Sequence, residues 1–377
     1  MIMKTRGIIL IALLVVSLFT NQIFAQNSEK TKPKVQIALL LDCSNSMDGL
    51  IDQAKSQLWK IVNEMALAEY NGQTPDLQIA LYEYGNDGLP AQEGYIRQIS
   101  QFTTDLDKIS EDLFALKTNG GSEYCGQVID VSINQLLWSA SSKDLKMIFI
   151  AGNEPFTQGT FDYKAACKKS ISKGVIVNTI FCGNYQEGVT TFWKDGADLA
   201  DGKYLNIDQN IKEVYVASPY DDQILKLNNQ LNSTYIGYGS VGSVNKSRQV
   251  TQDNNAGAMS SETQINRAVS KSQVAYSNES WDLVDAYKKD DKKIEKLSDE
   301  ELPSELKGKS KAEVKTYLDN KQKEREKIQK EINELNDKRS KFVAEKKKEN
   351  SKDNTLDVVM IKAVRELAIS KNYKFKK

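Results

Sequence analysis

The distribution of apolar residues divides the chain into a first part of short alternating segments and a second part of longer, charged ones. Between residues 35 and 207, β-rich apolar runs alternate with amphipathic stretches at helical spacing. The run at 35–41 is almost continuously apolar, which is typical of a parallel strand buried on both faces. Further strands are predicted at 77–84, 95–100, 147–151, 175–181 and 204–207, and helices at 49–65, 105–116, 124–137, 161–172 and 221–231. This alternation predicts an α/β fold, with a doubly wound, mostly parallel sheet covered by helices on both faces.

The composition changes after the predicted domain at residues 34–232. Residues 233–285 are rich in Ser, Asn, Gln and Gly and have little apolar periodicity, so we predict a partly disordered linker. Residues 286–377 are rich in Lys and Glu and predict a long helix and a shorter amphipathic one near the end. We interpret the long helix first as a solvated element and second as a coiled-coil-like surface for self-association. Its short apolar stripe consists of Ile328, Ile332, Leu335 and Phe342.

The first 25 residues have the pattern of a secretory signal peptide. Lys4 and Arg6 precede an apolar run at 7–19, and Ala25 is a small residue suited to cleavage. We predict cleavage after Ala25, a short lead at 26–33, and export to the periplasm, the cell envelope or the medium; the alternative is a retained anchor. No later segment approaches about 20 consecutive apolar residues, so no membrane span is expected after cleavage.

Composition narrows the possible functions. Histidine is absent, which excludes Ser-His-Asp and Cys-His catalytic groups and histidine-ligated metals. We therefore expect a protein that is not an enzyme. Residues 26–280 carry an excess of acidic side chains and residues 281–377 an excess of basic ones. Because the basic side chains are interleaved with acidic ones, no nucleic-acid partner is expected.

The chain has four cysteines, Cys43, Cys125, Cys167 and Cys182. Export to an oxidising compartment favours disulfides, and four cysteines allow three pairings. We favour Cys43 with Cys125, because these residues belong to loops that meet at one edge of the predicted sheet. Cys167 with Cys182 would then join a helix to the strand beside it.

A short polar motif follows the first predicted strand. Residues 42–46 read Asp-Cys-Ser-Asn-Ser, which matches the Asp-x-Ser-x-Ser motif of von Willebrand factor type A domains. The chain resembles this family over about residues 34–230. The resemblance implies a metal-ion-dependent adhesion site that includes Asp42, Ser44 and Ser46 and holds Mg²⁺ or another divalent cation. The plainer alternative is that Ser44 or Ser46 caps the following helix.

Two further loops of the implied site depart from the family pattern. Ser122 stands where the family usually has Thr, and it keeps the hydroxyl group. Gly152 stands where the family has Asp, so Asn153 or Glu154 would supply an oxygen through a water molecule. The missing carboxylate would leave the cation with more net positive charge and a stronger attraction for a partner's carboxylate. Replacing Gly152 with Asp would then be expected to tighten cation binding.

These observations favour an exported, non-enzymatic protein-binding module whose cation accepts an acidic side chain of a protein partner. One alternative is a metal-free scaffold that assembles through its C-terminal helices. Another is a phosphatase-type enzyme with an Asp nucleophile after the first strand. That enzyme class requires a second Asp at position 44, which is Ser, and a cysteine phosphatase would require an Arg within residues 44–50, which contain none.

Overall fold

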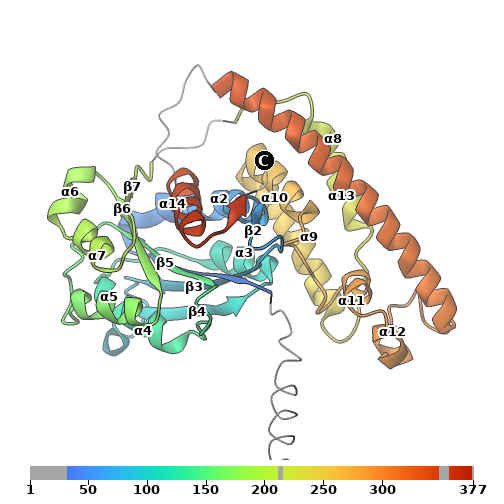
Figure 1. Ribbon diagram of the computed structural model, residues 1–377, viewed down its shortest axis with the longest axis horizontal. Helices are drawn as coiled ribbons and strands as arrows, with labels where there is room; N and C mark the ends of the chain where they lie inside the picture. The colour runs from blue at the N-terminus through green and yellow to red at the C-terminus, as the bar shows by residue number, and fades with distance from the viewer. Residues whose placement is uncertain (1–31, 211–214, 348–355, 376–377) are drawn as a thin grey trace, which may run out of the picture.

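A six-stranded sheet forms the centre of the computed structural model, which describes residues 32–210, 215–347 and 356–375 (Figure 1). The strand order is β4-β3-β1-β5-β6-β7, and only β4 runs antiparallel to its neighbour. The strands are β1 (Lys34–Asp42), β3 (Asp76–Tyr84), β4 (Ile96–Thr103), β5 (Leu145–Gly152), β6 (Ile176–Cys182) and β7 (Tyr204–Ile207). This sheet confirms the predicted mostly parallel α/β architecture. The predicted signal peptide lies outside the described residues.

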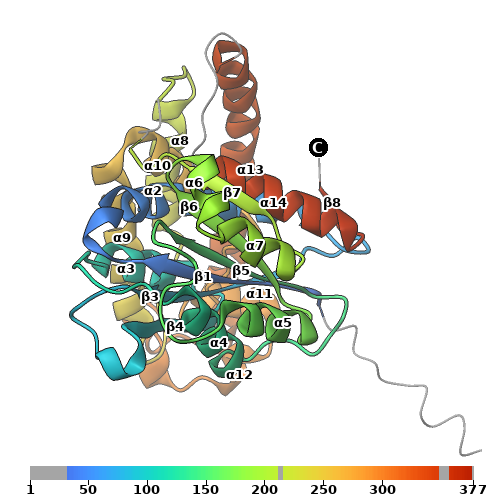
Figure 2. The same cartoon turned by 90° about the vertical axis from the view of Figure 1, so that its left-hand side faces the viewer.

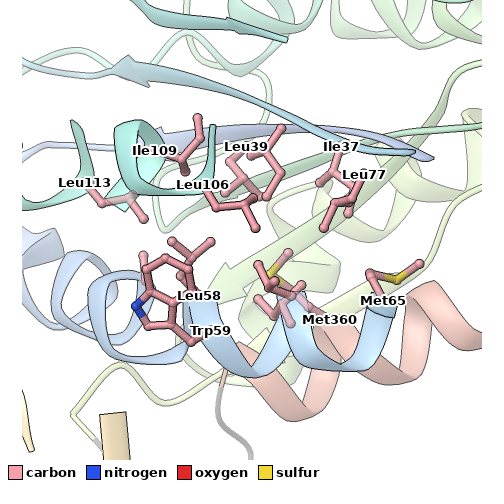
Figure 3. Packing of buried hydrophobic residues seen from close by; sticks show 14 of the residues in the cluster. Ile37, Leu39, Leu58, Trp59, Met65, Leu77, Leu106, Ile109, Leu113 and Met360 are labelled. Atoms are coloured by element: carbon pink, nitrogen blue, oxygen red, sulfur yellow. The ribbon is translucent and has the colours of Figure 1, made fainter. Parts of the chain in front are cut away.

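Helices cover both faces of the sheet. One face packs against α2 (Asp48–Ala66), α3 (Leu106–Ala115) and α14 (Leu356–Ser370), and the other against α4 (Cys125–Gln135), α5 (Tyr163–Ser172) and α7 (Trp193–Leu199), with α6 (Tyr185–Thr190) nearby. Figure 3 shows Leu58 and Met65 of α2 and Met360 of α14 pointing towards Ile37 and Leu39 of β1. Because β1 is apolar on both sides, it is buried from both faces.

Helix α14 completes the first face although it lies near the other end of the chain (Figure 2). The side chains of Gln53 and Gln57 on α2 accept hydrogen bonds from the first amides of α14, at 3.0 Å from Leu356 and 2.7 Å from Asp357. The segment after α14 forms β8 (Lys374–Phe375), which pairs antiparallel with β2 (Ala68–Glu69). The last segments are therefore built into the α/β unit.

The predicted linker at 233–285 is wrong, because this segment contains packed helices. After α8 (Asp221–Asn232) come α9 (Gly242–Met259), α10 (Ser261–Ser272), α11 (Leu283–Lys289) and α12 (Lys293–Lys296). Ile265, Ala268 and Val269 of α10 are buried in the same core as α2. The polar composition of this segment misled the prediction, because α9 and α10 also bury amide and charged side chains.

A buried ionic network joins α10 to the α/β unit. Arg267, which is 1 % exposed, donates to Asp107 of α3 at 2.7 Å and to Asp253 of α9 at 2.6 Å. Its guanidinium group lies 4.6 Å from the ring centroid of Trp59 on α2. Burial raises the pKa of Asp253, but Lys271 and Arg267 beside it outweigh burial and hold the pKa below its usual value. Burial of Lys271 lowers the pKa of its ammonium group to about 8.

Helix α13 (Lys311–Lys347) confirms the predicted long helix and runs along the outside of the helical part (Figure 1). Ile328, Ile332 and Leu335 of its apolar stripe are buried in the core of this chain, and Phe342 is half-buried. The predicted self-association through this stripe is therefore not supported. Within the described ranges, no helix is both long enough and apolar enough to cross a membrane.

Two buried arginines on α13 fix it to the rest of the molecule. Arg325 pairs with Asp282 at 2.6 Å, and Arg339 pairs with Asp221 at 2.9 Å. Both guanidinium groups are almost completely enclosed. The helix is therefore part of the folded interior on one side and solvated on the other.

Candidate functional site

The Asp-x-Ser-x-Ser loop lies at the carboxyl end of β1, where the chain turns into α2. Asp42 is fully buried, and its Oδ1 accepts a hydrogen bond from the amide of Ser44 at 2.8 Å. Its Oδ2 is also buried and has no hydrogen-bond partner among the described residues. The hydroxyl oxygens of Ser44 and Ser46 lie 3.2 Å apart, and Ser44 makes no capping hydrogen bond with its side chain. The loop therefore brings one carboxyl and two hydroxyls together, and the capping alternative is not realised for Ser44.

The loop that follows β5 at Gly152, which is called the third loop below, places Asn153 against the Asp-x-Ser-x-Ser loop. Its side-chain amide donates to Ser46 Oγ at 3.2 Å. Glu154 is placed differently, because its amide donates to Glu123 Oε2 at 3.3 Å and its carbonyl accepts from Trp193 at 2.8 Å. Within the described residues, no hydrogen bond links the Glu154 side chain to Asp42, Ser44 or Ser46. Of the two residues that the resemblance offered in this loop, Asn153 is the one in contact.

The loop before α4, which contains Ser122 and is called the second loop below, brings an acid that the sequence analysis missed. Ser122 is half-buried and makes no side-chain hydrogen bond to the Asp42 loop in the described parts of the chain. Its neighbour Glu123 is 2 % exposed and lies beside Asp42. A Cβ atom added to Gly85 would lie 2.8 Å from Asp42 Oδ1 and 2.8 Å from Glu123 Cγ, so the two side chains flank one point. The available signal was an acid next to Ser122 in the matched loop.

The two carboxyls change each other's ionisation. Burial, followed by the neighbouring Glu123, raises the pKa of Asp42 well above its usual value. Burial also raises the pKa of Glu123. Hydrogen bonding from Ser44 lowers both values but does not outweigh burial. Two adjacent buried carboxyls do not both ionise readily without a nearby positive charge. The pair therefore holds its protons to a higher pH than carboxyls in solvent do, unless a cation compensates its charge.

At position 152, where the family has Asp, the Tyr84 side chain occupies the space that another side chain would need. A Cβ atom on Gly152 would lie 2.6 Å from the Tyr84 hydroxyl oxygen and 3.0 Å from Asp42 Oδ2. Tyr84 is buried, and its hydroxyl donates to the carbonyl of Ala151 at 2.9 Å. The expectation that Asp at position 152 would tighten cation binding conflicts with this packing, since no side chain fits there without a shift.

The predicted disulfides are wrong, because all four cysteines are buried free thiols. Cys43 and Cys182 belong to the core under α2 and α14, whereas Cys125 and Cys167 belong to the core under α4 and α5. Each predicted pair is therefore separated by the sheet. Loop proximity misled the prediction, because side chains at one sheet edge still point to opposite faces. Burial raises the pKa of Cys167 to about 12 and that of Cys125 well above its usual value.

The donor set is made of oxygens and suits a hard divalent cation. Nowhere in the described ranges do three Asp, Glu or Cys side chains gather closely enough to hold a metal ion by themselves. The residues that fit such an ion are a buried carboxyl with an unpartnered oxygen and the adjoining hydroxyls of Ser44 and Ser46. Mg²⁺ prefers oxygen ligands of this kind and retains water molecules where protein ligands are missing.

An open, mostly parallel sheet with oxygen-bearing loops at its carboxyl edge defines a class of α/β proteins that bind ligands at that edge. Residues 36–190 match the family model of the von Willebrand factor type A domain. The match extends from β1 to α6 and includes the three loops at the carboxyl edge of the sheet. No curated protein matches the chain.

Three solved structures are similar to about half of this chain at low identity. BatB from Bacteroides thetaiotaomicron is 14 % identical, with 46 % of this chain and 90 % of that chain covered and a TM-score of 0.35. The VWA domain of SpRpn10 is 16 % identical, with 46 % of this chain and 88 % of that chain covered and a TM-score of 0.36. The vWF domain of the type V pili tip protein Mfa5 from Porphyromonas gingivalis is 13 % identical. The match covers 45 % of this chain and 87 % of that chain, with a TM-score of 0.32.

Proposed function

We propose that this protein is an exported, non-enzymatic binding module that recognises a protein partner through a divalent cation at the carboxyl edge of its sheet. The observation that carries the proposal is Asp42, whose buried Oδ2 has no hydrogen-bond partner among the described residues and which adjoins the hydroxyls of Ser44 and Ser46. Leaving a buried carboxylate oxygen without a partner is unfavourable, so a ligand at this point would stabilise the fold.

Each residue of the edge has a separate part in this proposal. Asp42 and the two serines would hold the cation, and Asn153 would fix Ser46 through its hydrogen bond. The cation would supply a positive charge that accepts an acidic side chain of the partner. Export is proposed from the basic, apolar and small residues of the first 25 positions and places the module in the periplasm or cell envelope.

The main alternative is a metal-free scaffold. The proximity of Glu123 to Asp42 favours this alternative, because a proton shared by the two carboxyls would reduce their repulsion without a cation. Assembly through the α13 stripe is not available to such a scaffold, since three of its residues are covered by the chain itself. A cysteine enzyme is disfavoured because burial raises the pKa of the Cys43 thiol far above neutrality.

Titration calorimetry with Mg²⁺ and Mn²⁺ on the full mature chain tests the proposal. We expect the wild type to bind and Asp42→Ala to lose binding, because that variant removes the carboxyl at the centre of the edge. Asp52→Ala is the matched control, since Asp52 is an exposed acid on α2. Equal binding by wild type and Asp42→Ala would contradict the cation mechanism and leave the metal-free scaffold.

A further inference from the structure

Glu123 is an interior acid without a basic partner. The interior acids of the helical contacts pair with arginines: Asp107 with Arg267 at 2.7 Å, Asp282 with Arg325 at 2.6 Å, and Asp221 with Arg339 at 2.9 Å. In the described ranges, neither Glu123 nor Asp42 forms an ion pair with Lys or Arg. Their polar neighbours include each other, Ser44 and Glu154, none of which carries a positive charge. A positive charge is therefore missing from this point of the interior, and buried carboxylates require one.

We propose that Glu123 supplies the second carboxylate of the cation site and replaces the acid that position 152 lacks. This inference rests on the proposed function. It combines three observations: Glu123 flanks the same point as Asp42, Asp42 Oδ2 is buried without a partner, and the Tyr84 hydroxyl blocks a side chain at Gly152. The acid has moved from the third loop to the second.

The second loop is held in place for this role by backbone hydrogen bonds to its neighbours. The amide of Asn119 donates to the carbonyl of Cys43 at 2.9 Å, and the amide of Asp87 donates to the carbonyl of Gly120 at 2.7 Å. The Glu123 carboxyl itself accepts from the amide of Glu154 at 3.3 Å. Three loops therefore fix the position of this carboxyl before any ligand arrives, which lowers the ordering that binding requires.

The charge balance of the site follows from this assignment. Two carboxylates, Asp42 and Glu123, neutralise the charge of one divalent cation. The sequence alone suggested that loss of the third-loop acid leaves the cation with more net positive charge. With Glu123 in the site, a second carboxylate removes that excess charge. Retention of the bare cation then depends strongly on Glu123 and little on Glu154.

Mn²⁺ calorimetry on the full mature chain separates these contributions. Glu123→Gln keeps the shape of the side chain and an oxygen for the Glu154 amide, and we expect it to weaken Mn²⁺ binding about 10- to 100-fold. Glu154→Gln is the matched control from the adjoining loop, and we expect its affinity to stay within about twofold of wild type. Thermal unfolding without Mn²⁺ establishes that each variant is folded.

Each result decides between the two proposals. Loss of binding in Asp42→Ala and Glu123→Gln, with Glu154→Gln unchanged, supports both. Loss in Asp42→Ala with wild-type affinity in Glu123→Gln overturns the role of Glu123 and leaves the proposed function standing. Wild-type affinity in Asp42→Ala overturns the proposed function itself. Should Glu123→Gln fail to fold, Glu123→Asp withdraws the carboxylate by one methylene, and wild-type affinity in that variant would also overturn the role of Glu123.

Discussion

Asp42 and Glu123 lie side by side in the interior, and burial raises the pKa of both carboxyls. Without a cation, the folded protein retains a proton that the unfolded chain has released. Raising the pH above the ordinary carboxyl range of about 4 therefore favours the unfolded chain. This effect continues until the pH passes the raised pKa of the pair. The contribution of the pair to stability is present at acid pH and lost as the pH rises.

We expect this loss to appear in urea unfolding as the pH is raised above the ordinary carboxyl range of about 4, with a chelator present. The doubly substituted Asp42→Asn, Glu123→Gln protein is the control, because it retains the side-chain shapes without the titrating groups. The difference in unfolding free energy between this control and the wild type should change with pH in favour of the control. Addition of Mg²⁺ should reduce the change. Parallel pH profiles for the two proteins would refute the interpretation of the carboxyl pair.

Sequence reasoning reached individual residues to different extents. Asp42, Ser44 and Ser46 were predicted as a group because they are adjacent in the chain and follow one strand. Glu123 was missed because its burial beside Asp42 depends on how two loops pack. The cysteine pairs failed for a related reason, since the order of loops does not specify the face to which each thiol points.

At the scale of elements, α10 joins the α/β unit through an ion network in which Arg267 is enclosed. Replacing Arg267 with Met keeps most of the side-chain volume but leaves Asp107 and Asp253 without that charge. Removing one partner from a buried ion pair costs about 3–5 kcal/mol, and we expect a loss of this size in the unfolding free energy. The measurement is urea unfolding at neutral pH.

The control for this prediction is an exposed pair. Lys194 and Asp198 form an ion pair on α7 with both side chains about half exposed. Lys194→Gln should leave the unfolding free energy close to that of the wild type, because solvent screens an exposed ion pair. Similar effects of the two substitutions would show that the buried network does not stabilise the contact between α10 and the α/β unit.

The elements themselves were predicted unevenly. The strands and the helices of the α/β unit followed from periods of apolar residues, because both faces of this sheet are covered. The segment with α9 and α10 was predicted as a linker because its buried face includes Gln249, Gln252 and Arg267. A pattern of apolar residues does not reveal helices whose interior contacts are largely polar. The long charged helix was predicted, but its packing within the chain was not.

For the whole molecule, one core joins parts that the sequence had separated. It includes Trp59 of α2, Ile265 of α10, Ile332 of α13 and Met360 of α14. We therefore expect a shortened chain of residues 26–235 to lack a cooperative unfolding transition, since it removes α14 from one face of the sheet and α10 from its packing against α2.

Near-ultraviolet circular dichroism and tryptophan fluorescence during urea unfolding test this expectation. The full mature chain is the reference and should show one cooperative transition for both signals. In the shortened chain Trp59 loses its contact with Arg267 and should become accessible to solvent. A cooperative transition in the shortened chain, with Trp59 still protected, would show that the α/β unit folds independently.

The hydrogen bond between Gln53 and the first amide of α14 joins residues 303 positions apart. At about 5–20 residues per second, ribosomes require on the order of 15–60 s to synthesise the intervening chain. During this time the sheet face is covered by α2 and α3 but lacks α14. In the proposed exported protein, completion of the sheet's cover is thereby postponed until α14 has been synthesised. Such a delay suits a polypeptide that crosses a membrane unfolded, because the finished domain does not form ahead of translocation.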